Sequence, residues 1–399
     1  MSEQSPARRA LGRNVITLSA VSLLTDVSSE MIYPLVPAFL STVLGANASA
    51  VGVVEGAAES TAALLKLVSG WLSDRTRRRK PLVILGYTIA AVARPLIAFA
   101  QSVGQVVAIR VTDRVGKGIR TSPRDALIAD SVDPSIRGRA FGFHRAADNA
   151  GAVVGPLIAF AILKTEGIPL RRVFLFAAIP GLLALVVLAI GARDTKRDDR
   201  APRKDVSLAR DMGTRFWLFL AVVFVFTLGN STDAFLLLRA AQAGVPIALA
   251  PLLWAMLNLV KAASNVPGGA LSDRVGRKPL IVAGWTLYAA VYFLFGHVSA
   301  PWQIWALFAV YGLYFGLTEG VQNALVADLV PASRRGAAFG WYNLAVGIGA
   351  HPASLIFGLI WDRASPHAAF TFGGSLALVA AVAIAFVAPG QQQRAPGRS

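Results

Sequence analysis

Two stretches of this chain carry nearly the same polar pattern at the end of an apolar segment. GWLSDRTRRRK runs from Gly70 to Lys80, and GALSDRVGRK runs from Gly269 to Lys278. In both copies a Ser-Asp-Arg triplet stands shortly before Lys-Pro-Leu. A pattern that occurs once in each half of a 399-residue chain indicates a duplicated unit.

Two further matches follow in the same order. ALIAD at 126–130 recurs as ALVAD at 324–328, and the RG and FG pairs at 137–142 recur at 335–340. Both matches have an offset of 198 residues (328 minus 130, and 335 minus 137). We therefore expect two related halves, which is what alternating access needs: two bundles that rock around a site between them.

The composition indicates a membrane protein. Of the 399 residues, 55% are hydrophobic and only 15% are charged, and the mean hydropathy is +0.57. Soluble domains carry about 25% charged residues, so this chain must expose apolar side chains to a lipid bilayer. A net charge of +17 first suggests nucleic acid, but the basic residues form short clusters between apolar segments, so we predict no such partner. The absence of cysteine excludes disulfides and thiolate metal sites.

Apolar windows of roughly 20 residues mark twelve expected transmembrane helices. The predicted fold is therefore all-α and membrane-integral, with two pseudo-symmetric six-helix bundles. The first window has no small-residue cleavage site, so we interpret it as an uncleaved span rather than a signal peptide. The windows lie near 14–42, 50–73, 80–100, 103–126, 138–163, 171–192, 214–240, 246–271, 279–298, 302–328, 337–361 and 367–389.

Basic residues alternate along the connections. Those after spans 2, 6 and 8 are rich in Arg and Lys, whereas 45–50 and 299–303 contain neither. The positive-inside rule then predicts a multi-pass protein of the cell (inner) membrane with both termini in the cytoplasm. The charge-mixed segment 193–213 predicts a cytoplasmic linker between an N-terminal bundle at 1–192 and a C-terminal bundle at 214–399.

Together these motifs resemble the major facilitator superfamily over nearly the whole chain. Its signature between spans 2 and 3 is Gly, Asp-Arg and a basic run; the first copy departs by one extra residue and by Arg77 in place of Gly, whereas the second keeps Gly276. The resemblance implies a gate that locks the cytoplasmic side, with each Asp beside a helix N-terminus near Gly336 or Gly138. The alternative is that the basic residues only set orientation. The expected gate residues are Gly70, Asp74, Arg75, Lys80, Gly269, Asp273, Arg274 and Arg277.

Span 5 carries a second resemblance. Gly151, Gly155 and Pro156 match the Gly-x-x-x-Gly-Pro core of the superfamily's antiporter motif. Glycines allow close helix packing and proline bends a helix. The usual Gly-Gly further on is absent, because Ala159 and Phe160 stand there. A plain small-residue packing motif is the alternative.

Ionisable side chains are costly at membrane depth, so each needs a partner or a function. In span 4, Arg110 and Asp113 are three residues apart and could pair on their own helix. A carboxylate beside an arginine stays ionised, and one moved away from it into apolar surroundings takes up a proton. Rocking bundles would then couple proton flow to transport; the alternative is a static ion-pair network. The expected proton-coupling residues are Asp26, Glu30, Arg110, Asp113, Arg114, Arg145 and Asp148, with Asp26 and Asp113 as proton sites and Arg110 as the switch partner.

The superfamily's spans 1, 4, 7 and 10 line a central cavity, and its span 4 places an Arg before Gly-x-Gly. Here the Gly-x-Gly is formed by Gly116 and Gly118, and which arginine takes that role stays open. The residues expected to line the substrate cavity are Glu59, Arg94, Asn230, Asp233, Asn258, Lys261, Tyr314 and Glu319.

The predicted function is a proton-coupled exporter of a small organic molecule. A proton-driven importer and an exporter of a metal ion or metal chelate such as a siderophore are alternatives, and a non-transporting scaffold or sensor is an alternative of another class.

No two of the four histidines lie at i, i+4, so we predict no resident metal, and we expect no cofactor. No Walker loop, Gly-x-Ser-x-Gly or His-Glu-x-x-His motif points to an enzyme. The resemblance implies a monomer.

Overall fold

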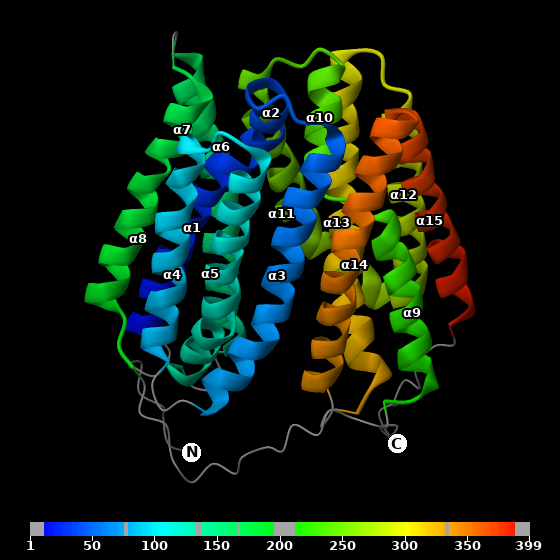
Figure 1. Ribbon diagram of the computed structural model, residues 1–399. Helices are drawn as coiled ribbons and strands as arrows, with labels where there is room; N and C mark the ends of the chain where they lie inside the picture. Colours follow the sequence, from blue (N-terminus) through cyan, green and yellow to red (C-terminus); the bar gives the residue numbers. More distant parts are fainter. Residues whose placement is uncertain are drawn as a thin grey trace, which may run out of the picture.

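The computed structural model describes residues 12–75, 79–132, 137–165, 168–194, 212–331 and 335–387, and these ranges are helical with short connections (Figure 1). The helices are α1 (Arg13–Ile32), α2 (Val36–Ala38), α3 (Ala48–Arg75), α4 (Lys80–Ala93), α5 (Val103–Asp130), α6 (Arg137–Lys164), α7 (Leu170–Phe176), α8 (Ala178–Gly191), α9 (Thr214–Gly229), α10 (Ala234–Gln242), α11 (Ala250–Val275), α12 (Arg277–Gly296), α13 (Pro301–Leu329), α14 (Arg335–Arg363) and α15 (Pro366–Phe386). Tighter or wider turns extend them at η2 (Tyr33–Leu35), η3 (Phe39–Val43), η4 (Arg94–Phe99) and η6 (Ile247–Leu249).

Within the described residues, ten helical segments are long and apolar enough to cross a membrane. The prediction of an all-helical membrane protein is therefore confirmed, whereas the count of twelve spans stays a prediction. The other two, α3 and α5, have 28 residues each, or about 42 Å of helix. Their charged residues keep them below the apolarity of a free-standing span, and the two helices pack against each other.

The helices form two groups that meet in the middle of the molecule. Figure 1 shows α4 to α8 on one side and α9, α12 and α15 on the other, with α3 and α14 facing each other between them. We call 13–191 the N-terminal bundle and 214–386 the C-terminal bundle. The predicted boundaries at 192 and 214 stay predictions, because 195–211 lie outside the described residues.

The molecule has two ends, which we name by their connections. The basic end is where α3 and α11 finish and α4 and α12 begin, beside the Arg- and Lys-rich connections. The opposite end carries the connections α2–α3 and α14–α15. In Figure 1, α3 and α14 lie side by side toward the opposite end and diverge toward the basic end, which is drawn at the bottom.

A seam of small residues joins the bundles at the opposite end. A Cβ added to Gly52 of α3 would lie 2.3 Å from the carbonyl oxygen of Ser354 of α14, and one added to Gly56 would lie 2.8 Å from Nδ1 of His351. Glycine at these positions therefore allows the two backbones to touch. The other contacts of this seam are Ser60 Oγ donating to the carbonyl of Gly347 at 2.8 Å, Ser49 against Gly358, and the N–H groups of Ala48 and Ser49 donating to Asp362 at 2.9 and 2.8 Å.

The seam covers only the first part of α3. Gly347 still meets Ala63, but beyond that point Leu64 and Val68 are 48% and 56% exposed. The apolar core shows the same division. One large cluster of buried side chains joins both bundles near the opposite end, whereas a separate small cluster around Leu18 and Tyr87 belongs to the N-terminal bundle alone. The bundles are thus in contact at the opposite end and apart at the basic end.

The sequence repeat corresponds to a repeated ion pair at the basic end. Arg79, just before α4, pairs with Asp130 at the end of α5, and Arg277 at the start of α12 pairs with Asp328 near the end of α13 at 3.6 Å. Both residues of the second pair lie 198 positions after their counterparts, which is the offset of the sequence repeat. The pairs join neighbouring helices within each bundle, α4 with α5 and α12 with α13.

Among the gate residues whose surroundings the structure describes, Lys80, Arg274 and Gly269 form no contact between the bundles. Lys80 Nζ donates to the carbonyl of Ala192 at 2.7 Å within the N-terminal bundle, Arg274 is exposed, and an added Cβ at Gly269 would meet nothing within 4 Å. The close approach expected at Gly269 is therefore absent here, because the bundles are apart at this end. The structure describes Gly70, Asp74, Arg75 and Asp273 only as parts of their helices, so the predictions for their contacts lie outside the described features.

The small-residue seam yields a test. In Gly52→Leu, the added side chain cannot fit against Ser354, so we expect the contact at the opposite end to weaken by roughly 1–3 kcal/mol, about fivefold or more in population. Because the chain has no cysteine, Ser60→Cys provides a single reporter inside the seam. Labelling of this cysteine by an impermeant maleimide should increase in Gly52→Leu. Gly104→Leu, where an added Cβ has open space, is the control, and equal labelling in both would contradict this assignment.

Candidate functional site

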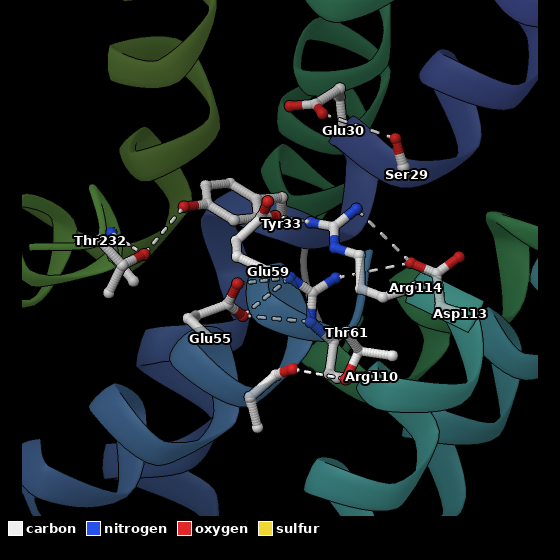
Figure 2. Close-up of polar contacts among 12 residues, drawn as sticks. Ser29, Glu30, Tyr33, Glu55, Glu59, Thr61, Arg110, Asp113, Arg114 and Thr232 are labelled. Carbon is white, nitrogen blue, oxygen red and sulfur yellow. Dashed lines mark hydrogen bonds and ion pairs between the residues drawn. The ribbon is translucent and has the colours of Figure 1, made fainter. Parts of the chain in front are cut away.

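A network of buried ion pairs connects α3, α4 and α5 at mid-depth (Figure 2). Arg110 of α5 binds Glu55 of α3 in a forked contact, with Nε and Nη2 donating to Oε1 at 3.1 and 2.8 Å and Nη2 donating to Oε2 at 2.6 Å. Both side chains are at most 3% exposed. A fork of this kind satisfies the guanidinium and the carboxylate together, as a buried pair requires. The fork joins α3 to α5, the two helices that are too polar to be stable alone in lipid.

Asp113 lies at the centre of three arginines. Arg94 of η4 donates from Nε to Asp113 Oδ1 at 2.9 Å and from Nη1 to the carbonyl of Thr25 at 2.8 Å. Arg110 and Arg114 approach Oδ2 at 3.9 and 3.8 Å. The pairing expected between Arg110 and Asp113 is thus the longer contact, because the long arginine side chain reaches across to Glu55. Arg94, expected in the substrate cavity, is buried within this network.

The next pair along α5 faces water. Arg114 Nη2 lies 3.0 Å from Oε1 of Glu59, and although Arg114 is 8% exposed, the Glu59 side chain is 45% exposed. On the C-terminal bundle, Lys261 and Glu319 pair at 3.6 Å with 31% and 53% of their side chains exposed. Glu59 and Lys261 both lie well inside their helices, α3 and α11. These exposed charges lie on the facing sides of the two bundles, and we call the space between these sides, toward the basic end, the crevice.

Aromatic and polar contacts close the crevice toward the opposite end. Trp254 of α11 donates from Nε1 to Oε2 of Glu30 in α1 at 2.6 Å, and its ring lies 4.7 Å from that of Tyr33. The Tyr33 hydroxyl lies 3.4 Å from Oγ1 of Thr232 in the C-terminal bundle. The guanidinium of Arg110 also lies over the Tyr33 ring, 5.7 Å from its centroid. The contacts that close the crevice therefore adjoin the ion-pair network (Figure 2).

Helices α1 and α6 pack in parallel with a fixed register. An added Cβ at Gly151 would lie 2.9 Å from Cβ of Asp26, and one at Gly155 would lie 3.1 Å from Cβ of Glu30. Both contacts, like the 3.4 Å contact between Ser19 and His144, join residues 125 positions apart. The Gly-x-x-x-Gly-Pro motif therefore brings the α6 backbone against the two carboxylates of α1.

Titratable side chains follow this α1–α6 seam toward the basic end. His144 Nε2 and Arg145 Nη1 each lie 3.7 Å from Asp148, but Arg145 is 77% exposed and only Asp148 and His144 are largely buried. The Asp26 carboxylate has neither a hydrogen bond nor an ion pair within the described residues. Its charged neighbours are Asp148 on α6, Glu30 on α1, and Lys117 and Arg120 on α5.

The remaining expected cavity residues divide between core and interface. The hydroxyl of Tyr311 donates to Asp233 Oδ1 at 2.6 Å, and that of Tyr288 donates to Oδ1 of Asn230 at 3.1 Å. Tyr314 is 4% exposed in the same aromatic core, so it does not line the crevice. Asn258 donates to the carbonyl of Ala152 at 3.3 Å and so joins α11 to α6 across the bundles.

Sequence reasoning left several residues out of the candidate site. Glu55, Tyr33 and Trp254 form the contacts described above, and Lys66 and Lys117 are half-buried beside the Arg114–Glu59 pair. For the two lysines and Glu55, the sequence signal was a charged residue inside an apolar window that is expected to span the membrane. Tyr33 and Trp254 gave none, since aromatic side chains are common in membrane helices.

Comparison with known proteins identifies the family. The sequence matches the Major Facilitator Superfamily over residues 18–260 and 218–399. The chain belongs to the major facilitator superfamily. An uncharacterized MFS-type transporter of Methanocaldococcus jannaschii is 33% identical over 95% of this chain and 96% of its own. A multi-drug resistance efflux pump, PmrA of Streptococcus pneumoniae, is 25% identical over 78% of this chain and 79% of its own.

Solved structures of superfamily transporters share the fold. An inward-facing, unoccupied bacterial homolog of the human lysosomal transporter Spinster superposes with a TM-score of 0.68 at 18% identity over 96% of each chain. The nucleoside transporter NupG superposes with a TM-score of 0.77 at 13% identity, covering 94% of this chain and 98% of that one. This superfamily member is therefore a multi-pass membrane transporter.

The buried fork gives a test of the network. In Glu55→Ala, Arg110 is left buried without its main counter-charge, and we expect a loss of about 3–5 kcal/mol in unfolding free energy. Glu319→Ala breaks a solvated pair and should cost less than about 1 kcal/mol. Reversible unfolding in mixed SDS micelles measures both. Replacing both partners, as Glu55→Leu with Arg110→Met, should recover much of the loss, and equal losses in the two single variants would contradict the assignment.

Proposed function

We propose that this transporter is a proton-coupled exporter of a small organic molecule that works by alternating access. The observation that supports it most is Asp26, a carboxylate without a partner among the described residues, held against the α6 backbone by Gly151 at the seam that leads to the crevice. A carboxylate that lacks a partner and lies beside other carboxylates, as Asp26 lies beside Asp148 and Glu30, takes up a proton more readily than a paired one. In this proposal Asp26 carries the proton, with Glu30 and Asp148 as the next groups along the seam.

The ion-pair network has a different role in the proposal. Asp113 is surrounded by three guanidinium groups, which stabilise its ionised form. We therefore assign Asp113, Arg110 and Arg94 to holding α3, α4 and α5 together, and leave proton binding to Asp26. Arg114 and Glu59, together with Lys261, Glu319 and Asn258, would contact the substrate.

The proposed orientation decides which side of the membrane the crevice faces in this conformation. The positive-inside rule places the basic end, and with it both termini, in the cytoplasm of the cell (inner) membrane. The crevice then opens to the cytoplasm, where an exporter loads its substrate. The proposed transporter has twelve spans, among them α3 and α5. They form two bundles, at 1–192 and 214–399, and the protein works as a monomer. The similarity to a multi-drug resistance efflux pump favours export over import. The basic connections around Asp74 and Asp273 would close the cytoplasmic side once the bundles rock.

Everted membrane vesicles test the coupling. A substrate is first found by comparing the sensitivity of cells with and without the gene to a broad panel of toxins, dyes and metals. Adding that substrate to energised vesicles should dissipate part of the pH gradient, because protons leave in exchange for it. Asp26→Asn removes the titratable group at nearly constant shape, so we expect it to lose this response while the protein still folds. The readout is the fluorescence of a pH-gradient dye.

Asp194→Asn is the matched control. The same change is made outside the crevice, where Oδ1 caps the start of α4 by accepting from the N–H groups of Arg79 and Lys80, a bond that asparagine keeps. This variant should respond like the wild type. Normal coupling by Asp26→Asn would refute the assignment, and cells that accumulate the substrate would indicate an importer.

A further inference from the structure

We propose that the substrate of this transporter is an organic anion, and that Lys66 and Lys117 bind its carboxylate or phosphate group. The inference rests on the proposed transport function and adds the chemical class of the substrate. It depends on two lysines, one on each of two adjoining helices, that form no ion pair in the described part of the protein.

The two lysines lie on helices in direct contact. Lys117 is the fifteenth of the 28 residues of α5, so it is roughly 20 Å from either end. An added Cβ at its neighbour Gly118 would lie 2.5 Å from Cβ of Leu65, the residue before Lys66. Ser122 Oγ also donates to the carbonyl of Lys66 at 2.9 Å. The lysines are therefore placed together on the wall of the crevice, next to Arg114 and Glu59.

Neither ammonium group has a carboxylate within ion-pair distance among the residues whose positions are described. The acids near them have other partners, since Glu59 binds Arg114 at 3.0 Å and Asp125 binds Arg124 at 2.9 Å. The third, Asp26, is the proposed proton carrier and forms no ion pair with either lysine. The two lysines also repel each other electrostatically. Two positive charges thus remain uncompensated at mid-membrane, where such groups normally pair.

The surrounding groups strengthen this excess of positive charge. Arg114 Nε is buried without a hydrogen-bond partner in the described structure, and Arg120 further along α5 is 4% exposed with its guanidinium over the Tyr87 ring at 4.4 Å. On the facing wall, Lys261 is balanced by Glu319. A bound anion would neutralise the excess, whereas a cation would add to it. This preference selects an anionic substrate over a cationic one.

The test uses the full-length protein in nanodiscs of phosphatidylcholine, which carries no net charge. Three probes share one ring system: 2-naphthoate is an anion, 2-naphthamide is neutral, and 2-naphthylmethylamine is a cation. We expect 2-naphthoate, or inorganic phosphate, to raise the midpoint of thermal unfolding, and the amide and the amine not to. In Lys66→Gln with Lys117→Gln the anion shift should be lost. Lys278→Gln, at the basic end on the C-terminal bundle, should keep it.

The unliganded double variant provides a second readout. If the lysines are uncompensated charges, their removal should leave the unfolding midpoint unchanged or higher, whereas a structural role would lower it. The proposal is overturned if the midpoint falls, if the amine stabilises more than the naphthoate, if no anion shifts the wild type, or if the double variant keeps the shift. An added phosphatidylglycerol that abolishes the naphthoate shift in the wild type would support the site and identify a lipid headgroup as its anion.

The outcome is separable from that of the proposed function. If 2-naphthoate binds through the lysines but no substrate dissipates the pH gradient, then proton coupling fails and the anion site stands. If a neutral or cationic substrate dissipates the gradient and 2-naphthoate does not compete with it, the transporter is proton-coupled and the anion inference is wrong.

Discussion

A charge in the interior of a membrane protein needs an opposite charge, and this requirement organises the N-terminal bundle. Helices α3 and α5 fall below the apolarity of the other spans, and each contributes what the other lacks: Glu55 and Glu59 on one, Arg110 and Arg114 on the other. Arg94 brings α4 to the same network through Asp113. Pairing thus fixes which helices are neighbours, more specifically than apolar packing does in lipid.

The two bundles meet through a different kind of contact. Between α3 and α14 the interface is built from glycine, alanine and serine, and its few polar contacts go mostly to the backbone. Such a surface holds two helices closely without locking any long side chain into place. The ion pairs described above therefore lie within each bundle, whereas small-residue contacts and a few hydrogen bonds, such as that from Trp254 to Glu30, lie between them. This division fits the proposed rocking of two bodies.

The sequence predicted the fold better than the site. Apolar windows predicted the helices, and the 198-residue repeat predicted two related halves. The equivalent Arg79–Asp130 and Arg277–Asp328 pairs, which share this offset, appeared only in the structure. The partner of Arg110 was not predictable, because spacing on one helix favoured Asp113 whereas the tertiary structure placed Glu55 within reach. Glycine motifs showed that a close approach exists, but not which helix approaches, so the contact of Gly151 with Asp26 appeared only in the structure.

The polarity of α3 has a consequence for biosynthesis. A nascent helix that carries Glu55, Glu59 and Lys66 partitions poorly into lipid by itself, and its main counter-charge, Arg110, is synthesised 55 residues after Glu55. The ribosome must therefore synthesise two more helices, α4 and α5, before the charge of Glu55 can be neutralised. We infer that α3 is retained in a protected, polar environment of the insertion machinery until α5 emerges, and that the two helices are released into the bilayer as a pair.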